Sequence, residues 1–170
     1  MAQQAQWDLG HEAARDIAAA LNLLLADEFA LLLKTKGCRW HVSGPQFQGH
    51  QLLFHQLEEQ INVEIDGIAE RIRRIGPTAL SSIGDVSRLQ RLAGNHVAGL
   101  SPLEMLTALL DDNLQLGGHL REAHGLCEGY GDVATANRLE KWIDDAEGRV
   151  RDLFAASRPT QGTDPATPRG

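Results

Sequence analysis

The side chains best able to bind a metal ion gather between Cys38 and Glu70. This stretch carries His50, His55, Asp66 and Glu70, and both imidazole and carboxylate groups bind divalent metals. Asp66 and Glu70 stand four positions apart, so on a helix both carboxylates reach one cation. His55 lies several turns earlier and needs a bend or a second subunit to join them. Because acids one turn apart also occur on ordinary solvated helix faces, this spacing alone does not establish a metal site.

A di-iron centre enclosed in a single bundle requires a different pattern. It needs Glu-x-x-His on each of two helices, so that carboxylate and imidazole point together into the core. No glutamate in this sequence is followed three positions later by histidine. The sequence therefore argues against a metal centre of that kind.

Long helices are the elements that must carry these residues. The apolar pattern predicts helices at about 11–39, 46–75, 101–127 and 132–157, with a short helix near 83–92 in the crossover. Gly76-Pro77 is a stop signal, and Ser101, Pro102 and Glu104 form a start signal. These helices and the lack of a convincing strand predict an all-α four-helix bundle with a short helix between the second and third long helices. Apolar residues nearly encircle the second half of the first helix, which predicts burial on more than one side, including a subunit interface.

The second helix has two distinct faces. Successive residues turn by about 100°, which places Gln51, His55, Asn62 and Asp66 together, with Glu70 at the edge of their face. The candidate ligands should thus point away from the core of their own subunit. The opposite face is an apolar stripe of Phe54, Leu57, Ile61, Ile65, Ile68, Ile72 and Ile75.

Length and composition set the remaining bounds. The 170 residues fit one domain, predicted at 11–157, between a flexible N-terminal tail at 1–10 and a disordered C-terminal tail at 158–170. A net charge of -7 argues against a surface built to grip phosphates, and two isolated cysteines without a CxxC pair favour a reducing compartment. With no signal peptide or membrane span expected, we predict a cytoplasmic protein.

Two segments resemble the Dps family, the mini-ferritins also called DNA-binding proteins from starved cells. These are WHVSGPQF, at 40–47, and IDGIAERIRRIGPTALSSIGD, at 65–85. The similarity extends roughly from Ala14 to Ala155. It implies a homododecameric shell that takes up ferrous iron, oxidises it with hydrogen peroxide and stores ferric mineral, with a ferroxidase site shared across a two-fold interface. In that family the site is completed by residues of a partner subunit, which agrees with the predicted faces of the second helix.

The family's ligand pattern is only partly present. The family has histidine just before a tryptophan, a second histidine eleven residues after it, and an aspartate four residues further on. Here Trp40 is in place beside the site, but Arg39, Gln51 and His55 occupy those three positions. The partner subunit's D-x-x-x-E-R element is kept as Asp66, Glu70 and Arg71. Arginine cannot donate a lone pair, and glutamine offers only a neutral carbonyl, so the ferroxidase site is altered.

Two interpretations of this altered site stay open. Arg39 of one subunit can form a salt bridge with Asp66 or Glu70 of the other, its guanidinium taking the place of the metal. Alternatively, His55, Asp66 and Glu70 bind iron in a rebuilt site. The resemblance also places Glu128 and Asp132 at an acidic three-fold pore, although acids there equally suit a helix N-terminus.

Three functional hypotheses follow. The first is an iron-handling shell with an impaired ferroxidase site, and the second is a structural or nucleoid-associated shell without iron chemistry. The third is an unrelated helical interaction module. DNA binding should be weak or absent, because the tails lack the lysines that would neutralise phosphates. We expect His96, His119 and His124 to be exposed or hydrogen-bonded, and Trp142 and Phe154 to serve packing.

Overall fold

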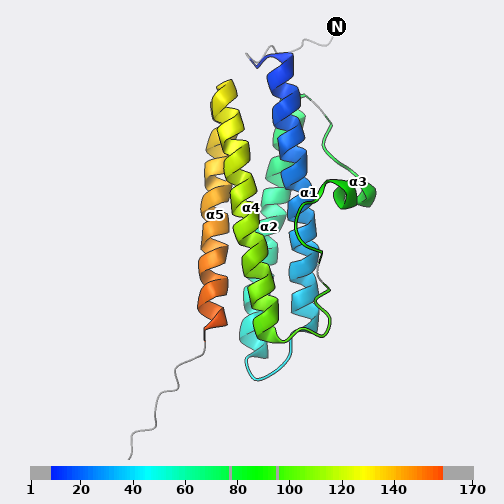
Figure 1. Ribbon diagram of the computed structural model, residues 1–170, viewed down its shortest axis with the longest axis vertical. Coiled ribbons are helices and arrows are strands. Elements are labelled where there is room, and N and C mark those ends of the chain that lie inside the picture. The colour runs from blue at the N-terminus through cyan, green and yellow to red at the C-terminus, as the bar shows by residue number, and fades with distance from the viewer. Residues whose placement is uncertain (1–8, 77, 95, 159–170) are drawn as a thin grey trace, which may run out of the picture.

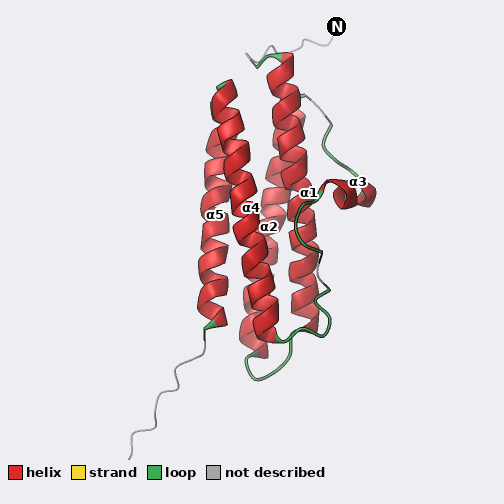
Figure 2. Cartoon of the chain, viewed as in Figure 1, coloured by secondary structure: helices red, strands yellow, loops and turns green. Residues whose placement is uncertain are grey.

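Four long helices lie side by side in the computed structural model, which describes residues 9–76, 78–94 and 96–158 (Figure 1). They are α1 (His11–His41), α2 (Phe47–Ile75), α4 (Pro102–Tyr130) and α5 (Val133–Ser157), and the short α3 (Ile83–Leu89) lies in the crossover between α2 and α4. All regular structure in the described part of the chain is helical (Figure 2). The predicted all-α bundle, including its crossover helix, is confirmed.

The helix ends follow local chemistry. At the start of α4, the Ser101 hydroxyl accepts a hydrogen bond from the Glu104 backbone N–H at 3.3 Å, and the Glu104 carboxylate accepts one from the Ser101 N–H at 2.7 Å. This capping box was predicted from the sequence. The helix continues to Tyr130, beyond the predicted end near residue 127, because the left-handed backbone it needs to stop comes only at Gly131, where φ is 73°.

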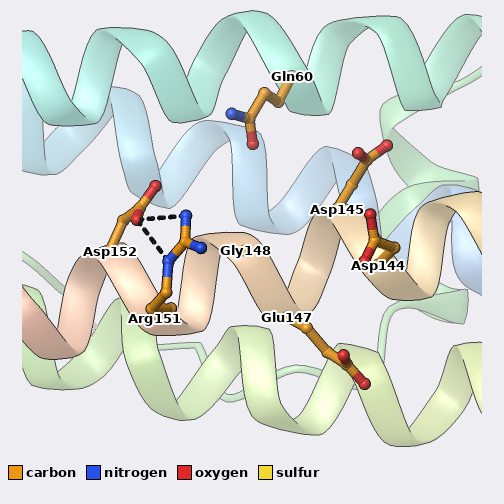
Figure 3. A pocket seen from close by; sticks show the side chains of 7 residues that line it. All are labelled: Gln60, Asp144, Asp145, Glu147, Gly148, Arg151 and Asp152. Carbon is orange, nitrogen blue, oxygen red and sulfur yellow. Dashed lines mark hydrogen bonds and ion pairs between the residues drawn. The ribbon is translucent and has the colours of Figure 1, made fainter.

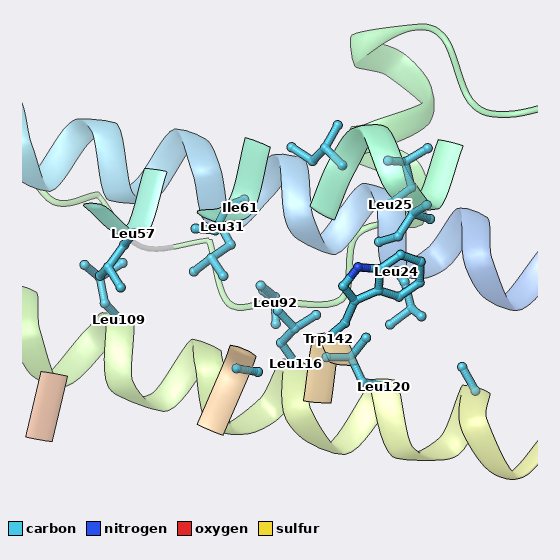
Figure 4. Packing of buried hydrophobic residues seen from close by; sticks show 14 of the residues in the cluster. Leu24, Leu25, Leu31, Leu57, Ile61, Leu92, Leu109, Leu116, Leu120 and Trp142 are labelled. Atoms are coloured by element: carbon cyan, nitrogen blue, oxygen red, sulfur yellow. The ribbon is translucent and has the colours of Figure 1, made fainter. Parts of the chain in front are cut away.

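The core is a continuous apolar layer between the four long helices (Figure 4). The predicted stripe of α2 faces it, and α2 approaches α5 closely where a Cβ on Gly67 would lie 3.1 Å from a ring carbon of Trp142. Trp142 therefore serves packing as predicted. Phe154 does not, because its side chain lies on an outward face of α5 and is 49% exposed, under the guanidinium of Arg158.

The crossover is tied to α1 by buried polar contacts. The Asp27 carboxylate, wholly buried, accepts hydrogen bonds from the Arg91 backbone N–H at 2.6 Å and from its guanidinium at 2.6 and 3.0 Å. Lys34 donates to the Ala93 carbonyl at 2.7 Å. The short helix α3 ends at Leu89, before the predicted end at 92, because Gln90 is extended with ψ of 143°. These contacts fix the irregular segment against the bundle.

Most of the predicted tails, 1–10 and 158–170, lie outside the described residues. In the described part, no helix combines the length and apolar character required to cross a membrane. On α1, Leu24, Leu25 and Leu31 are buried in the subunit, whereas Leu33 remains 65% exposed. Leu33 is the one large aliphatic side chain in the second half of α1 that is mostly exposed.

Candidate functional site

The predicted acidic ligands lie on the outward face of α2. Asp66 and Glu70 are exposed, one turn apart, and His55 is exposed on the same helix. Glu70 has only a loose contact of 4.0 Å with Arg74, and His55 lies 3.6 Å from Glu59. A rise of about 1.5 Å per residue separates His55 from Asp66 by about 16 Å along the helix. Within one subunit, His55 and the two acids therefore cannot bind the same ion.

The described residues contain no group of three or more His, Cys, Asp or Glu side chains placed to hold a metal ion. A site using Asp66 and Glu70 would need ligands beyond those two acids. The division of ligands between two subunits stays a prediction.

The three altered positions gather where α1 ends and α2 begins. The Gln51 side-chain amide donates to the Arg39 carbonyl at 3.4 Å, which holds the start of α2 against the end of α1. Trp40 stands beside them with 60% of its surface exposed. This hydrogen bond places Gln51 beside Arg39, and in one subunit both lie apart from Asp66 and Glu70.

Arg39 already has an acidic partner in its own chain. Its Nε donates to Glu58 Oε1 at 2.6 Å, and Lys36 Nζ lies 3.2 Å from the other oxygen of the same carboxylate. The hydrogen bond that Arg39 donates to Glu58 raises the pKa of Arg39, and the charge of that carboxylate adds to this rise against the opposing effect of burial. The guanidinium is therefore a fixed positive charge anchored to the subunit surface, at a position where the ligand pattern calls for a histidine.

Sequence reasoning missed Glu58 as a functional residue. It follows Leu57 in the apolar stripe and is only 3% exposed, so a signal existed in the form of an acid at a buried register of α2. A buried carboxylate needs a cationic or hydrogen-bonding partner. Its partner, Arg39, lies on another helix, so the spacing of residues in the sequence could not identify it.

His50 lies on the core side, away from the Gln51 position. It is 9% exposed and its ring stacks on Phe54 with 6.4 Å between centroids. His41 is exposed, and its Nδ1 lies 2.7 Å from the Gly37 carbonyl. His50 is one residue before Gln51, and a shift of one residue along a helix turns the side chain to another face. Neither His50 nor His41 therefore replaces the histidine that the family pattern has at the position of Gln51.

The two acids assigned to a pore differ in environment. Asp132 is 4% exposed, caps α5 through the Thr135 N–H at 3.1 Å, and accepts two hydrogen bonds from Arg71 at 2.9 and 3.2 Å. Burial alone would raise its pKa, but the Thr135 hydrogen bonds and the Arg71 charge hold the pKa of Asp132 below its usual value. Glu128 is exposed, 3.5 Å from His124. Asp132 thus serves as a helix cap and an ion-pair partner, and of the two only Glu128 presents its carboxylate to the outside.

The other histidines take the expected roles. His119 Nδ1 lies 3.0 Å from the buried Asp27 carboxylate, and His124 Nε2 lies 3.3 Å from Glu140. His96 is exposed in the crossover.

An acidic hollow of about 470 Å³ lies between α2 and α5 (Figure 3). Asp145, Glu147 and Asp152 in its lining pair with Lys141 at 2.5 Å, Arg121 at 2.5 Å and Arg151 at 3.2 Å respectively. Their charges are therefore largely compensated by neighbouring cations. The full lining is Gln60, Asp144, Asp145, Glu147, Gly148, Arg151 and Asp152.

Known proteins resemble this chain over nearly its whole length. A model of the ferritin-like domain matches residues 18–156. The chain is 32% identical to an uncharacterized low temperature-induced protein of Nostoc sp., over 94% of this chain and 92% of the relative. It is 33% identical to the DNA protection during starvation protein of Agrobacterium fabrum, over 88% of this chain and 83% of that protein.

Solved structures share the same fold. A Dps protein from Bacillus brevis aligns with a TM-score of 0.83 and 26% identity, covering 88% of this chain and 99% of that one. DpsC from Streptomyces coelicolor aligns with a TM-score of 0.88 and 21% identity, covering 91% of each chain.

Proposed function

Since the chain belongs to the Dps family of ferritin-like proteins, we propose that it forms an iron-storing shell whose inter-subunit ferroxidase site is impaired. The shell is a homododecamer that binds and retains iron and so protects the cell from oxidative stress, with ferrous iron and hydrogen peroxide as substrates. It works in the cytoplasm and can associate with the nucleoid. Its own binding to DNA is weak or absent. Family membership excludes the unrelated interaction module.

The exposed face of α2 supports the shared site. Asp66 and Glu70 point outward without a close cation among the described residues of their own chain, since the Arg74 contact of Glu70 is 4.0 Å long. Large apolar side chains are also exposed on α1 and α2, among them Trp40 at 60%, Leu52 at 59% and Val63 at 71%. A second copy would cover apolar surface of this kind and bring new groups to the two acids.

The anchoring of Arg39 by Glu58, at 2.6 Å, is the observation that carries the impairment. A cation held on the ligand-supplying side repels ferrous iron and supplies no lone pair. The bond to Glu58 uses Nε alone, so the terminal amino groups of Arg39 can still donate to Asp66 or Glu70 of a second copy. We favour this arrangement over a rebuilt iron site of His55, Asp66 and Glu70.

Iron loading tests the proposal. Ferrous iron is added aerobically, and with hydrogen peroxide, to the assembled protein, and the oxidation rate and the iron retained per shell are measured after separation by size. We expect retained iron with an oxidation rate close to that of iron in buffer. A shell that retains no iron would support the alternative, a structural or nucleoid-associated shell without ferroxidase activity. Rapid oxidation that is lost in His55→Ala would instead support the rebuilt site.

A further inference from the structure

Four polar side chains meet at the centre of the bundle, one from each long helix. They are Glu28 on α1, Glu64 on α2, Asn113 on α4 and Arg149 on α5, and none is more than 2% exposed. The surrounding core is apolar, so every charge in this group must be balanced within it. We call these four residues the central cluster.

Three members of the central cluster satisfy one another. Arg149 donates to the two Glu64 carboxylate oxygens at 2.5 and 3.2 Å, and its Nε donates to Asn113 Oδ1 at 2.7 Å. The Asn113 side-chain amide donates in turn to the Leu109 carbonyl at 2.8 Å. The positive charge of Arg149 is thereby cancelled by Glu64 through a bidentate pair.

Glu28 is the member left over. Both of its carboxylate oxygens are buried, and neither receives a hydrogen bond from a donor in the described residues. An ionised carboxylate without donors is strongly disfavoured in an apolar interior, whereas a protonated one carries an O–H that can itself donate. The Glu64 carboxylate is a neighbouring acid whose negative charge acts on Glu28. Two carboxyl groups beside one guanidinium are therefore electrically neutral when one of the carboxyl groups is protonated.

We propose that Glu28 is a proton-binding site of the folded chain, with its carboxyl O–H donating to Glu64. The central cluster is electrically neutral while this proton is bound, and it carries an uncompensated negative charge in the middle of the bundle once the proton leaves. Alkaline conditions thus loosen the packing of α1 against α2, which gives the subunit a built-in sensitivity to pH. This role is independent of the iron chemistry on the outer face.

The charges facing Glu28 support this assignment. Burial, followed by the negative charge of Glu64 and the hydrogen bond with it, raises the pKa of Glu28 well above its usual value, while Arg149 opposes the shift. On its own helix, the Asp27 carboxylate acts in the same direction as Glu64. On α5, the charge of Asp145 raises the pKa of Arg149, as the charges of Glu64 and Glu28 do more strongly. On α4, the member of the central cluster is the neutral Asn113. Lys141 of α5 lies near Glu64 but is exposed.

The sign of the pH dependence follows. The folded chain keeps the Glu28 proton at pH values where the unfolded chain has released it. Stability is therefore highest below the ordinary glutamate pKa and declines as pH rises toward the folded value. Within that window the folding equilibrium constant falls by about tenfold per pH unit for one proton.

Glu28→Gln tests the proposal, because glutamine has the same shape, cannot ionise and can donate its amide N–H to Glu64. Denaturant unfolding of the full chain is followed from pH 5 to pH 9 for the wild type, for Glu28→Gln and for the matched control Glu122→Gln, an exposed residue of α4. We expect Glu28→Gln to flatten the decline above neutral pH and to be the more stable protein at pH 9, and the control to follow the wild type. A Glu28→Gln protein that keeps the wild-type pH profile would overturn the proposal.

Infrared spectroscopy of the unmutated protein, with carbon-13 in its glutamate side chains, gives a second readout that needs no variant. We expect the carbonyl band of a buried protonated glutamic acid at pH 7, which disappears at alkaline pH. Absence of that labelled band at pH 7 would equally overturn the assignment. The label separates Glu28 from Asp112, whose carboxyl is also buried and has a raised pKa, chiefly through burial.

Discussion

The buried and the exposed acids of α2 have opposite surroundings. Inside the bundle, Glu64 is 2% exposed and held in a bidentate pair by Arg149 of the same chain. Two residues later in sequence, Asp66 points outward, and Glu70 has only the 4.0 Å contact with Arg74. The interior carboxylate is paired within its own subunit, whereas the outer acids have no close cation among the described residues. The difference separates an acid that holds the fold together from acids that are open to an outside partner.

Removing the interior cation should have the largest effect. Arg149→Met keeps most of the side-chain length but leaves Glu64 beside Glu28 without a counter-charge, and breaking a buried pair in this way costs about 3–5 kcal/mol. The free energy of unfolding is measured by denaturant titration. Arg151→Met, two residues further along α5 and paired only with its neighbour Asp152, is the matched control and should change stability by less than about 0.5 kcal/mol. Equal effects of the two variants would erase the distinction between interior and surface charges.

A smaller effect is expected at the junction of α4 and α5. Asp132→Asn keeps a good helix cap but removes the charge that pairs with Arg71, so we expect a loss of about 1–2 kcal/mol at pH 7. Because the folded pKa of Asp132 is lowered, its contribution is present above the ordinary aspartate pKa and is lost as pH falls through the folded value. Thermal unfolding at pH 7 and at pH 3 should therefore differ less for the variant than for the wild type. A variant with the same pH dependence as the wild type would assign the acid sensitivity to other groups.

The smallest effect on folding belongs to the outer acids. Asp66→Asn combined with Glu70→Gln should leave the helical circular dichroism spectrum unchanged, since neither carboxylate has a close partner in the part of the subunit that the structure describes. Ferrous iron binding by the assembled protein, measured by titration, should also stay unchanged, because the salt bridge that we favour leaves no metal at these two acids. A double variant that loses helical structure would show that these acids serve the fold, as Glu64 does.

The sequence predicted the architecture well because helix signals are local. Residues within a few positions of one another determine the apolar stripe of α2, the cap formed by Ser101 and Glu104, and the position of α3. The predicted ends at 127 and 92 were wrong by three residues each, in opposite directions, because the stop depended on the backbone at Gly131 and Gln90. Such conformations are set by the following turn as much as by residue type.

Charge pairing was harder to predict. Helix periodicity correctly placed Asp66 on the outward face, but it did not predict that His50 is buried. It could not foresee that Glu58 anchors Arg39, or that Arg71 of the D-x-x-x-E-R element reaches Asp132 across 61 positions. These pairs join different helices, and their register depends on how the helices pack. The same holds for Glu28, whose pKa is raised chiefly by burial and next by the charge of Glu64, while Arg149 opposes the rise.

Ferrous oxidation by a restored ligand set tests the central claim most directly. The triple variant Arg39→His, Gln51→His and His55→Asp installs the three family ligands opposite Asp66 and Glu70, and Arg88→His, in α3, is a control that alters an exposed arginine outside the altered site. The initial rate of ferrous iron oxidation by the assembled proteins is compared with that of the wild type. We predict a gain of about tenfold or more for the triple variant, which corresponds to at least about 1.4 kcal/mol of barrier, and none for the control. A triple variant that assembles but oxidises iron no faster than the wild type would contradict the claim that these three positions impair the site.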